Sequence, residues 1–198
     1  MSLEAEDLAR ADLYGVLARL FYAAPDAQFL SELKQRAAGV AESAPGGNAL
    51  ATAWRDLGEA CASAFPAHLE NEHTELFIGT GKAEITPYLS HYTMRHESDT
   101  PLVQLRARLA GWGIARREGV AEYEDHISGL CETMRFAIAV QHRALEEQRD
   151  FFARFLYEGA MRFLAALSAS EKARFYKRVA DLARAFFDVE QQAFSMVG

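Results

Sequence analysis

The sequence predicts an all-α fold, in which about eight helices form the bundle of a single domain. Of its 198 residues, 57 are Ala or Leu, which favour helices in this setting, and 20 are Val, Ile or Thr, which favour strands. Apolar residues also recur at intervals of three and four, the spacing of one helix face. Half of the residues are apolar and a quarter are charged, a balance that excludes a disordered or fibrous chain.

The N-terminal helical part covers about residues 1–77. Its first helix must end before Pro25, because the residue before a proline disfavours the helical conformation. Asp26 is then in position to cap a second helix. The apolar face of the first helix consists of Leu13, Val16, Leu17, Leu20 and Phe21, and that of the second of Phe29, Leu30, Leu33 and Val40.

Two further helices follow in this part. The run Ser43–Gly47 is rich in Gly and Pro and predicts a loop, after which Asn48 can cap the third helix. We expect that helix to place Phe65 inward and to end at Pro66. A fourth helix is expected over about 67–77, with Leu69, His73, Leu76 and Phe77 inward.

A long connection is expected over about residues 78–100. Gly79, Gly81 and Pro87 interrupt it, and few of its apolar residues are periodic. Five of the six histidines lie between Pro66 and His126, in and around this stretch. Because long irregular connections inside compact domains are uncommon and often functional, we expect a site here.

The C-terminal helical part covers about residues 101–198. Asp99 or Thr100, followed by Pro101, predicts a helix start, and Gly111, Gly113 and Gly119 surround that helix's end. One later apolar stripe consists of Ile127, Leu130, Met134, Ile138 and Leu145, and another of Phe152, Phe155, Leu156, Gly159 and Phe163. The run Ser168–Glu171 has the form of a capping box, which predicts the start of the last helix.

Charge and hydropathy exclude several classes of protein. The net charge of −7 and the absence of a Lys/Arg tract argue against binding to nucleic acid or to an anionic membrane, and favour a basic partner. No apolar run reaches the roughly 18 residues of a membrane span, so no stable membrane insertion is expected. The acidic start is unlike a signal peptide, which predicts a cytoplasmic protein.

Metal sites are not predicted. Cys61 and Cys131 are far apart and have no zinc-type spacing, so we interpret both as reduced thiols in the core. A two-iron bundle needs Glu-x-x-His on two helices, and Glu70 with His73 is a single match.

Catalytic motifs are equally scarce. There is no Gly-x-Ser-x-Gly, and Cys131 lies in the middle of an apolar stripe where a thiol is inert. Residues 79–82, Gly-Thr-Gly-Lys, are a fragment of a phosphate-binding loop without its full spacing. We therefore assign no catalytic residue and no cofactor.

Two segments are more specific. The first, Leu76–Tyr92, reads Leu-Phe-Ile-Gly-Thr-Gly and ends in Pro-Tyr-Leu-Ser-His-Tyr; the second, Glu122–Met134, begins Glu-Tyr-Glu-Asp-His-Ile. Together they resemble the TorD/DmsD family of cytoplasmic redox-enzyme maturation chaperones, in which Pro stands where this chain has Tyr123. The helical layout is similar along nearly the whole chain.

The resemblance implies a chaperone that is not an enzyme. Its partners would be the twin-arginine signal peptide, and possibly the apo catalytic subunit, of a molybdenum-cofactor oxidoreductase before export. The resemblance also implies a monomer or a helix-exchanged homodimer; guanine-nucleotide binding has been proposed for relatives, and the client enzyme is not specified.

The candidate cargo-binding residues come from both segments. Carboxylates suit the arginines, and aromatic and aliphatic side chains suit the apolar part of the peptide. Asp125 lies close enough to a helix start that capping alone would explain it, and His126 there is expected to stay neutral. The candidates are Pro87, Tyr88, Ser90, Tyr92, Glu122, Glu124, Asp125 and His126.

Two variants test these roles. We expect Asp125→Ala to weaken peptide binding with thermal stability near that of the parent, and His126→Leu to keep the helix and impair cargo binding. The alternative functions are a metal-binding helical-bundle oxidoreductase and a cargo-free helical dimerisation module, for which the Phe-rich C-terminal helices leave room.

Overall fold

A computed structural model describes residues 4–43, 48–79, 83–94, 96, 100–115 and 122–196 of the chain. Within these ranges the elements are helices, and the one β-type pairing is an isolated bridge between Tyr88 and His126. The predicted all-α class is therefore confirmed. Residues 44–47 of the expected loop, residues 80–82 of the phosphate-loop fragment (Gly81 included), Asp99 and Gly119 lie outside the described residues.

The chain divides into two compact units, each made of separate stretches of sequence. Unit 1 comprises Met1–Ala18 and Thr86–Phe163, and unit 2 comprises Arg19–Ile85 and Leu164–Met196. Helices α1 (Ala5–Tyr22) and α9 (Glu158–Ala169) each contribute residues to both units. Among the described helices, none combines the length and the apolar character that a membrane crossing requires.

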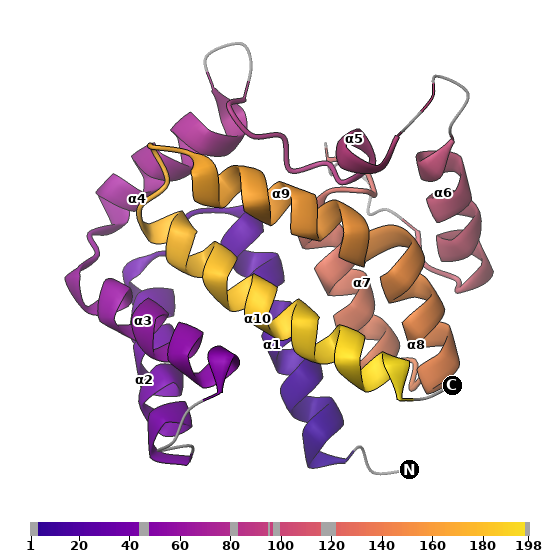
Figure 1. Cartoon of the computed structure of the whole chain (residues 1–198), viewed down its shortest axis with the longest axis horizontal. Helices are drawn as coiled ribbons and strands as arrows, with labels where there is room; N and C mark the ends of the chain where they lie inside the picture. The colour runs from indigo at the N-terminus through magenta and orange to yellow at the C-terminus, as the bar shows by residue number, and fades with distance from the viewer. Residues whose placement is uncertain are drawn as a thin grey trace. The chain divides into compact units, whose positions relative to one another are not determined.

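Unit 2 contains α2, α3, α4 and α10 with the π-helical segment η1. Their bounds are α2 Ala27–Ser43, α3 Ala49–Ser63, α4 Pro66–His73, η1 Thr74–Ile78 and α10 Phe175–Ser195. Both predicted caps are confirmed: the Asp26 carboxylate accepts from Phe29 N at 2.8 Å, and the Asn48 side chain accepts from Ala51 N at 2.9 Å. Helices α2 and α3 lie side by side (Figure 1), and Gly58 of α3 leaves room for the Ala37 methyl group of α2.

One prediction about α3 is wrong. The helix ends at Ser63, and the side chain of Phe65 is 65% exposed rather than inward. Pro66 begins α4, where its fixed φ suits the first helical turn and its missing N–H removes no intrahelical bond. The proline therefore acts as a start signal here, and Phe65 is the non-helical residue before it.

The predicted capping box is also wrong. Ser168 lies inside α9, and the start of α10 has no cap from its own Ser or Glu side chains. The carboxylate of Glu72, in α4, accepts instead from the backbone N–H groups of Arg174 (2.8 Å), Phe175 (3.3 Å) and Tyr176 (2.9 Å). The first N–H groups of α10 are thus capped by a residue distant in sequence, whereas the local pattern predicted a cap from neighbouring residues.

Unit 1 contains the described motif residues. Its further elements are α5 Ser90–Thr93, α6 Pro101–Gly111, α7 Ile127–Ala139, α8 Leu145–Phe151 and the π-helical segment η2 Phe152–Tyr157, which leads directly into α9. Leu145 does not continue the stripe of α7, because α7 ends six residues earlier and Leu145 starts α8 partly exposed. The core is formed by fully buried side chains: Tyr14, Leu17, Leu130, Met134, Phe151, Phe152, Leu156 and Phe163.

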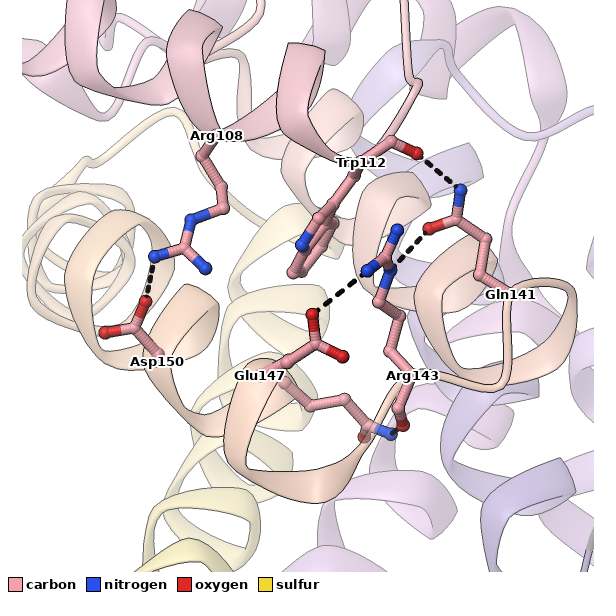
Figure 2. Close-up of polar contacts among 7 residues, drawn as sticks. Arg108, Trp112, Gln141, Arg143, Glu147 and Asp150 are labelled. Atoms are coloured by element: carbon pink, nitrogen blue, oxygen red, sulfur yellow. Dashed lines mark hydrogen bonds and ion pairs between the residues drawn. The ribbon is translucent and has the colours of Figure 1, made fainter.

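A polar network attaches the end of α6 to α8 and the turn before it (Figure 2). The carbonyl of Trp112 accepts from Gln141 Nε2 at 2.7 Å, and the Arg143 guanidinium lies over the Trp112 ring, 5.1 Å from its centroid. Arg143 also pairs with Glu147 at 3.0 Å, and Arg108 pairs with Asp150. Because Trp112 is buried and stacks on Phe151, α6 has a defined position within the unit.

Both cysteines are free and buried, as predicted. Cys61 belongs to unit 2 and Cys131 to unit 1. Burial disfavours the charged thiolate, so it raises the pKa of Cys61 to about 11 and raises that of Cys131 further still. Each unit therefore contains one thiol in an environment that suppresses its reactivity.

Candidate functional site

The two sequence motifs meet in an antiparallel backbone pairing. Leu89 N donates to Asp125 O, and Ile127 N donates to Pro87 O, both at 2.9 Å. These two bonds flank the Tyr88–His126 bridge. Segments that are more than thirty residues apart in sequence therefore form one site in unit 1. Hydrogen bonds and the bridge bring five of the eight predicted residues together there, Pro87, Tyr88, Ser90, Asp125 and His126, and the charge of Glu122 acts on Tyr88.

Asp125 is a buried acceptor. The residue is 4% exposed. Its Oδ2 accepts hydrogen bonds from the backbone N–H (3.3 Å) and the hydroxyl of Ser90. Its Oδ1 is buried without a hydrogen-bond partner. Since Ser90 is the first residue of α5, the carboxylate is placed at the N-terminus of that short helix, where a negative charge is favourable.

His126, and not Asp125, caps α7. Its Nδ1 accepts from Ser128 N at 3.1 Å, so this ring nitrogen acts as the capping acceptor. The ring is buried against Tyr88, with the ring centroids 5.3 Å apart. The Ser128 hydroxyl donates to Ala18 O at 2.8 Å and ties this start of α7 to α1.

Tyr88 and Tyr123 form the aromatic part of the site. Their rings lie edge to face at 5.9 Å, with Tyr88 half-buried and Tyr123 55% exposed. Burial raises the pKa of Tyr88, and the nearby negative charges of Glu122 and Asp125 raise it further. Sequence reasoning did not include Tyr123 among the site residues, although an aromatic residue between two glutamates was a visible signal.

Glu124 already has a cationic partner within the unit. Nε and Nη2 of Arg106, from α6, both donate to Glu124 Oε2, at 3.1 and 3.0 Å. This hydrogen bond is the main reason that the pKa of Arg106 is raised. Arg106 was missed because nothing local links it to Glu124; the network in Figure 2 fixes the helix that carries it.

Tyr92 lies at the other end of α5 and is directed into the unit. Its hydroxyl donates to Thr86 O at 3.0 Å, and its ring contacts Phe163 of α9 with centroids 6.1 Å apart. Burial raises the pKa of Tyr92. These contacts give Tyr92 a part in holding the 86–93 segment against unit 1.

The site thus combines buried residues with accessible side chains. Pro87, Asp125 and His126 are buried, whereas Tyr123 and His91 are exposed and Tyr88, Glu122 and Glu124 are half-buried. Aromatic rings beside carboxylates can hold a guanidinium by charge and by ring stacking. Nowhere in the described parts of the chain do three or more His, Cys, Asp or Glu side chains gather in a way that could hold a metal ion.

Comparison with known proteins adds one finding. The family model described as "Nitrate reductase delta subunit" matches residues 45–194, which is most of the chain and includes both motif segments. A search of curated proteins found no match to the chain.

Proposed function

This chain belongs to the nitrate reductase delta subunit family, a family of molybdoenzyme maturation chaperones, and from that premise we propose that it binds a twin-arginine signal peptide. The peptide would be that of a molybdenum-cofactor oxidoreductase. The chaperone would act in the cytoplasm, hold the precursor and its apo catalytic subunit during maturation, and catalyse no reaction itself.

The observation that carries this proposal is the pairing of the two motif segments. The Tyr88–His126 bridge joins the segment that carries Tyr88 to the one that carries Tyr123; the two rings are in contact, and the negative charges of Glu122 and Asp125 act on the Tyr88 hydroxyl. A twin-arginine signal has a basic part followed by an apolar part, so its two halves match the two kinds of side chain found here.

The electrostatics also favour such a ligand. The protein has a net charge of −7, which attracts a basic peptide over several ångströms before contact. At the site, burial raises the pKa of Tyr88, and the negative charges of Glu122 and Asp125 raise it further, so the surroundings of this hydroxyl favour a cationic ligand. An incoming guanidinium would interact with Glu122 and share Glu124 with Arg106.

The expected affinity is moderate. Burial of roughly four Leu-sized side chains of the peptide contributes about 6–12 kcal/mol. Association and ordering cost about 4–15 kcal/mol, which offsets most of that gain. A reversible complex follows, as a chaperone that must release its client requires.

Calorimetric titration with a synthetic twin-arginine signal peptide tests the proposal. The peptide should come from a molybdoenzyme encoded in the same genome. We expect saturable binding that is lost when both arginines are replaced by lysine, because lysine cannot form the bidentate pair. Absence of binding to every such peptide would contradict the proposal.

A pair of tyrosine variants locates the binding surface. Tyr123→Ala should weaken binding by about tenfold or more, because exposed aromatic residues at interfaces contribute strongly to affinity. Tyr22→Ala is the matched control, since Tyr22 is similarly exposed (59%) but belongs to unit 2. Equal affinities of the two variants would remove Tyr123 from the site.

A further inference from the structure

We propose that Gly159 and Arg162 of α9 are positioning residues that hold α5 in the conformation that binds cargo. Both lie outside the two sequence motifs. The inference rests on the proposed function for its effect on cargo, whereas the holding of α5 can be measured without any cargo.

Helix α5 cannot be stable by itself. It contains the four residues Ser90–Thr93. The α-type bond from Met94 N to Ser90 O at 3.0 Å closes its end, and the tighter bonds from His91 N to Tyr88 O (3.2 Å) and from Tyr92 N to Leu89 O (3.0 Å) close its start. A single turn fixes several backbone dihedral angles in return for one hydrogen bond, so isolated turns do not persist in water. Its conformation must therefore come from contacts with the rest of unit 1.

The N-terminal end of α5 is held by the second motif. Asp125 accepts from the N–H and hydroxyl of Ser90, and its backbone carbonyl accepts from Leu89 N. These contacts fix where the helix begins, but they do not fix the direction in which its one turn points.

The turn of α5 packs closely against the backbone of α9 at Gly159. A Cβ at this position would lie 2.9 Å from Leu89 Cβ, 3.1 Å from the Leu89 carbonyl oxygen and 3.3 Å from Thr93 Cγ2. Two of these atoms belong to the residue just before α5, and one of them is backbone. Glycine is thus the residue that lets α9 approach the segment this closely, and alanine would displace it.

The C-terminal end of α5 is held by Arg162, three residues further along α9. Its Nη1 donates to Tyr92 O at 2.6 Å, and its Nη2 donates to Glu158 Oε1 at 2.7 Å. Glu158 therefore orients the guanidinium toward a carbonyl in the last turn of α5. A cation at this end complements the Asp125 carboxylate at the other.

The held segment carries accessible side chains. His91 and Met94 are exposed at its end, and Tyr88, just before it, forms the aromatic pair with Tyr123. A shift of α5 by a fraction of an ångström would move all three relative to Glu122. Binding sites lose affinity when their supporting contacts allow such movement.

The test uses two variants, each with a matched control. Arg162→Ala is compared with Arg154→Ala, because Arg154 is similarly exposed and pairs with the acidic residue four positions earlier, Asp150, away from α5. Gly159→Ala is compared with Gly39→Ala, because a Cβ at Gly39 meets no atom within 4 Å. The measurements are hydrogen exchange of the Ser90 and Met94 amides without cargo, the peptide Kd, and Tm.

We expect both test variants to exchange these amides faster and to raise the Kd by about three- to tenfold, with Tm close to that of the controls. Unchanged exchange would show that Gly159 and Arg162 do not hold α5 and would overturn the inference. Faster exchange with an unchanged Kd would overturn the positioning role. If the parent protein binds no peptide, the proposed function fails together with the effect on cargo, and exchange alone decides whether α5 is held.

Discussion

The carboxylate of Asp125 shows how a motif residue can act through a neighbour. Two of its hydrogen bonds come from Ser90, and the residue is almost inaccessible to solvent. A peptide could reach Asp125 only after α5 had moved. We therefore interpret Asp125 as a support for the 88–93 segment, and Glu122 and Tyr123 as the groups available for contact.

This geometry changes the expectation for Asp125→Ala. Because the variant leaves the Ser90 donors without their acceptor, we expect a loss of about 1–3 kcal/mol in the free energy of unfolding together with weaker peptide binding. Glu122→Ala, three residues away and half-buried, should weaken binding with little loss of stability. Urea denaturation and calorimetry on both variants measure the two effects; retained stability in Asp125→Ala would restore the role of a direct contact.

Variants of His126 can separate its role as the cap of α7 from the role of its ring. His126→Leu removes the acceptor for Ser128 N and should cost about 1 kcal/mol of stability, whereas His126→Asn supplies a favoured capping side chain and should cost less. Thermal unfolding of the two variants measures the difference. If His126→Leu is as stable as His126→Asn, the cap contributes nothing and the ring acts through Tyr88 alone.

His73 predicts how stability depends on pH. Burial lowers its pKa below the usual 6.5, and a hydrogen bond with the backbone of Phe21 acts in the opposite direction. Its Nε2 is buried without a partner, so the charged form is poorly accommodated. The unfolded chain then binds the proton more readily than the folded protein does. His73 should therefore cost no free energy of unfolding above pH 6.5, and the free energy of unfolding should fall as the pH drops below that value.

Denaturant unfolding at pH 7.5 and 5.5 measures this effect. His73→Asn keeps a side-chain amide near the Nδ1 position but does not titrate, so it should lose less stability between the two pH values than the parent does. His68→Asn is the control, because His68 is exposed on the same helix. Equal acid sensitivity of His73→Asn and the parent would assign the effect to other groups.

At the scale of single residues, several candidates predicted from the sequence lie together in the structure, but the sequence did not predict their orientation. Asp125 and Ser90 were both candidates, and their hydrogen bond depends on a pairing between distant segments. Arg106 could not be predicted at all, since its partner Glu124 lies 18 residues away. Tertiary contacts of this kind have no local signature.

At the scale of elements, helix caps from neighbouring residues could be predicted from the sequence, whereas a cap from a distant residue could not. Asp26 and Asn48 cap helices that begin immediately after them, so short-range chemistry was sufficient to predict them. The cap of α10 comes from Glu72, about a hundred residues earlier. The local Ser168–Glu171 pattern was misleading because α9 continues through Ser168 to Ala169.

The Glu72 cap gives a prediction for α10. Glu72→Ala leaves three backbone N–H groups without their acceptor and should lower the free energy of unfolding by about 1–3 kcal/mol. Glu70→Ala is the control, since Glu70 is exposed on the same helix. Urea denaturation compares the two, and equal stability would show that solvent satisfies the end of α10 without Glu72.

At the scale of the whole molecule, the helical content followed from composition and periodicity, whereas the division into units did not. We expected a single bundle with a long connection over 78–100. The described structure groups the start of the chain with Thr86–Phe163 and the middle with Leu164–Met196. Periodicity reports which face of a helix is buried, but it does not report which other helix covers that face.

The two thiols report on the two units separately. Because Cys61 and Cys131 are buried with raised pKa values, neither should react with a thiol reagent in the native protein at neutral pH. Labelling across a denaturant series, followed by peptide mass spectrometry, measures the exposure of each. Coincident curves indicate cooperative unfolding of the units, and rapid labelling in the absence of denaturant would contradict the burial.

The interleaving of the units has a consequence for how the protein is made. A ribosome adds about 5–20 residues per second, and it completes Met1–Ala18 well before the Thr86–Phe163 stretch that shares its unit. Unit 2 likewise waits for Leu164–Met196, and contacts between distant segments form slowly. A nascent chain therefore lacks a complete unit 1, and with it the candidate site, until Phe163 has been made, and it lacks a complete unit 2 until Met196 has been made.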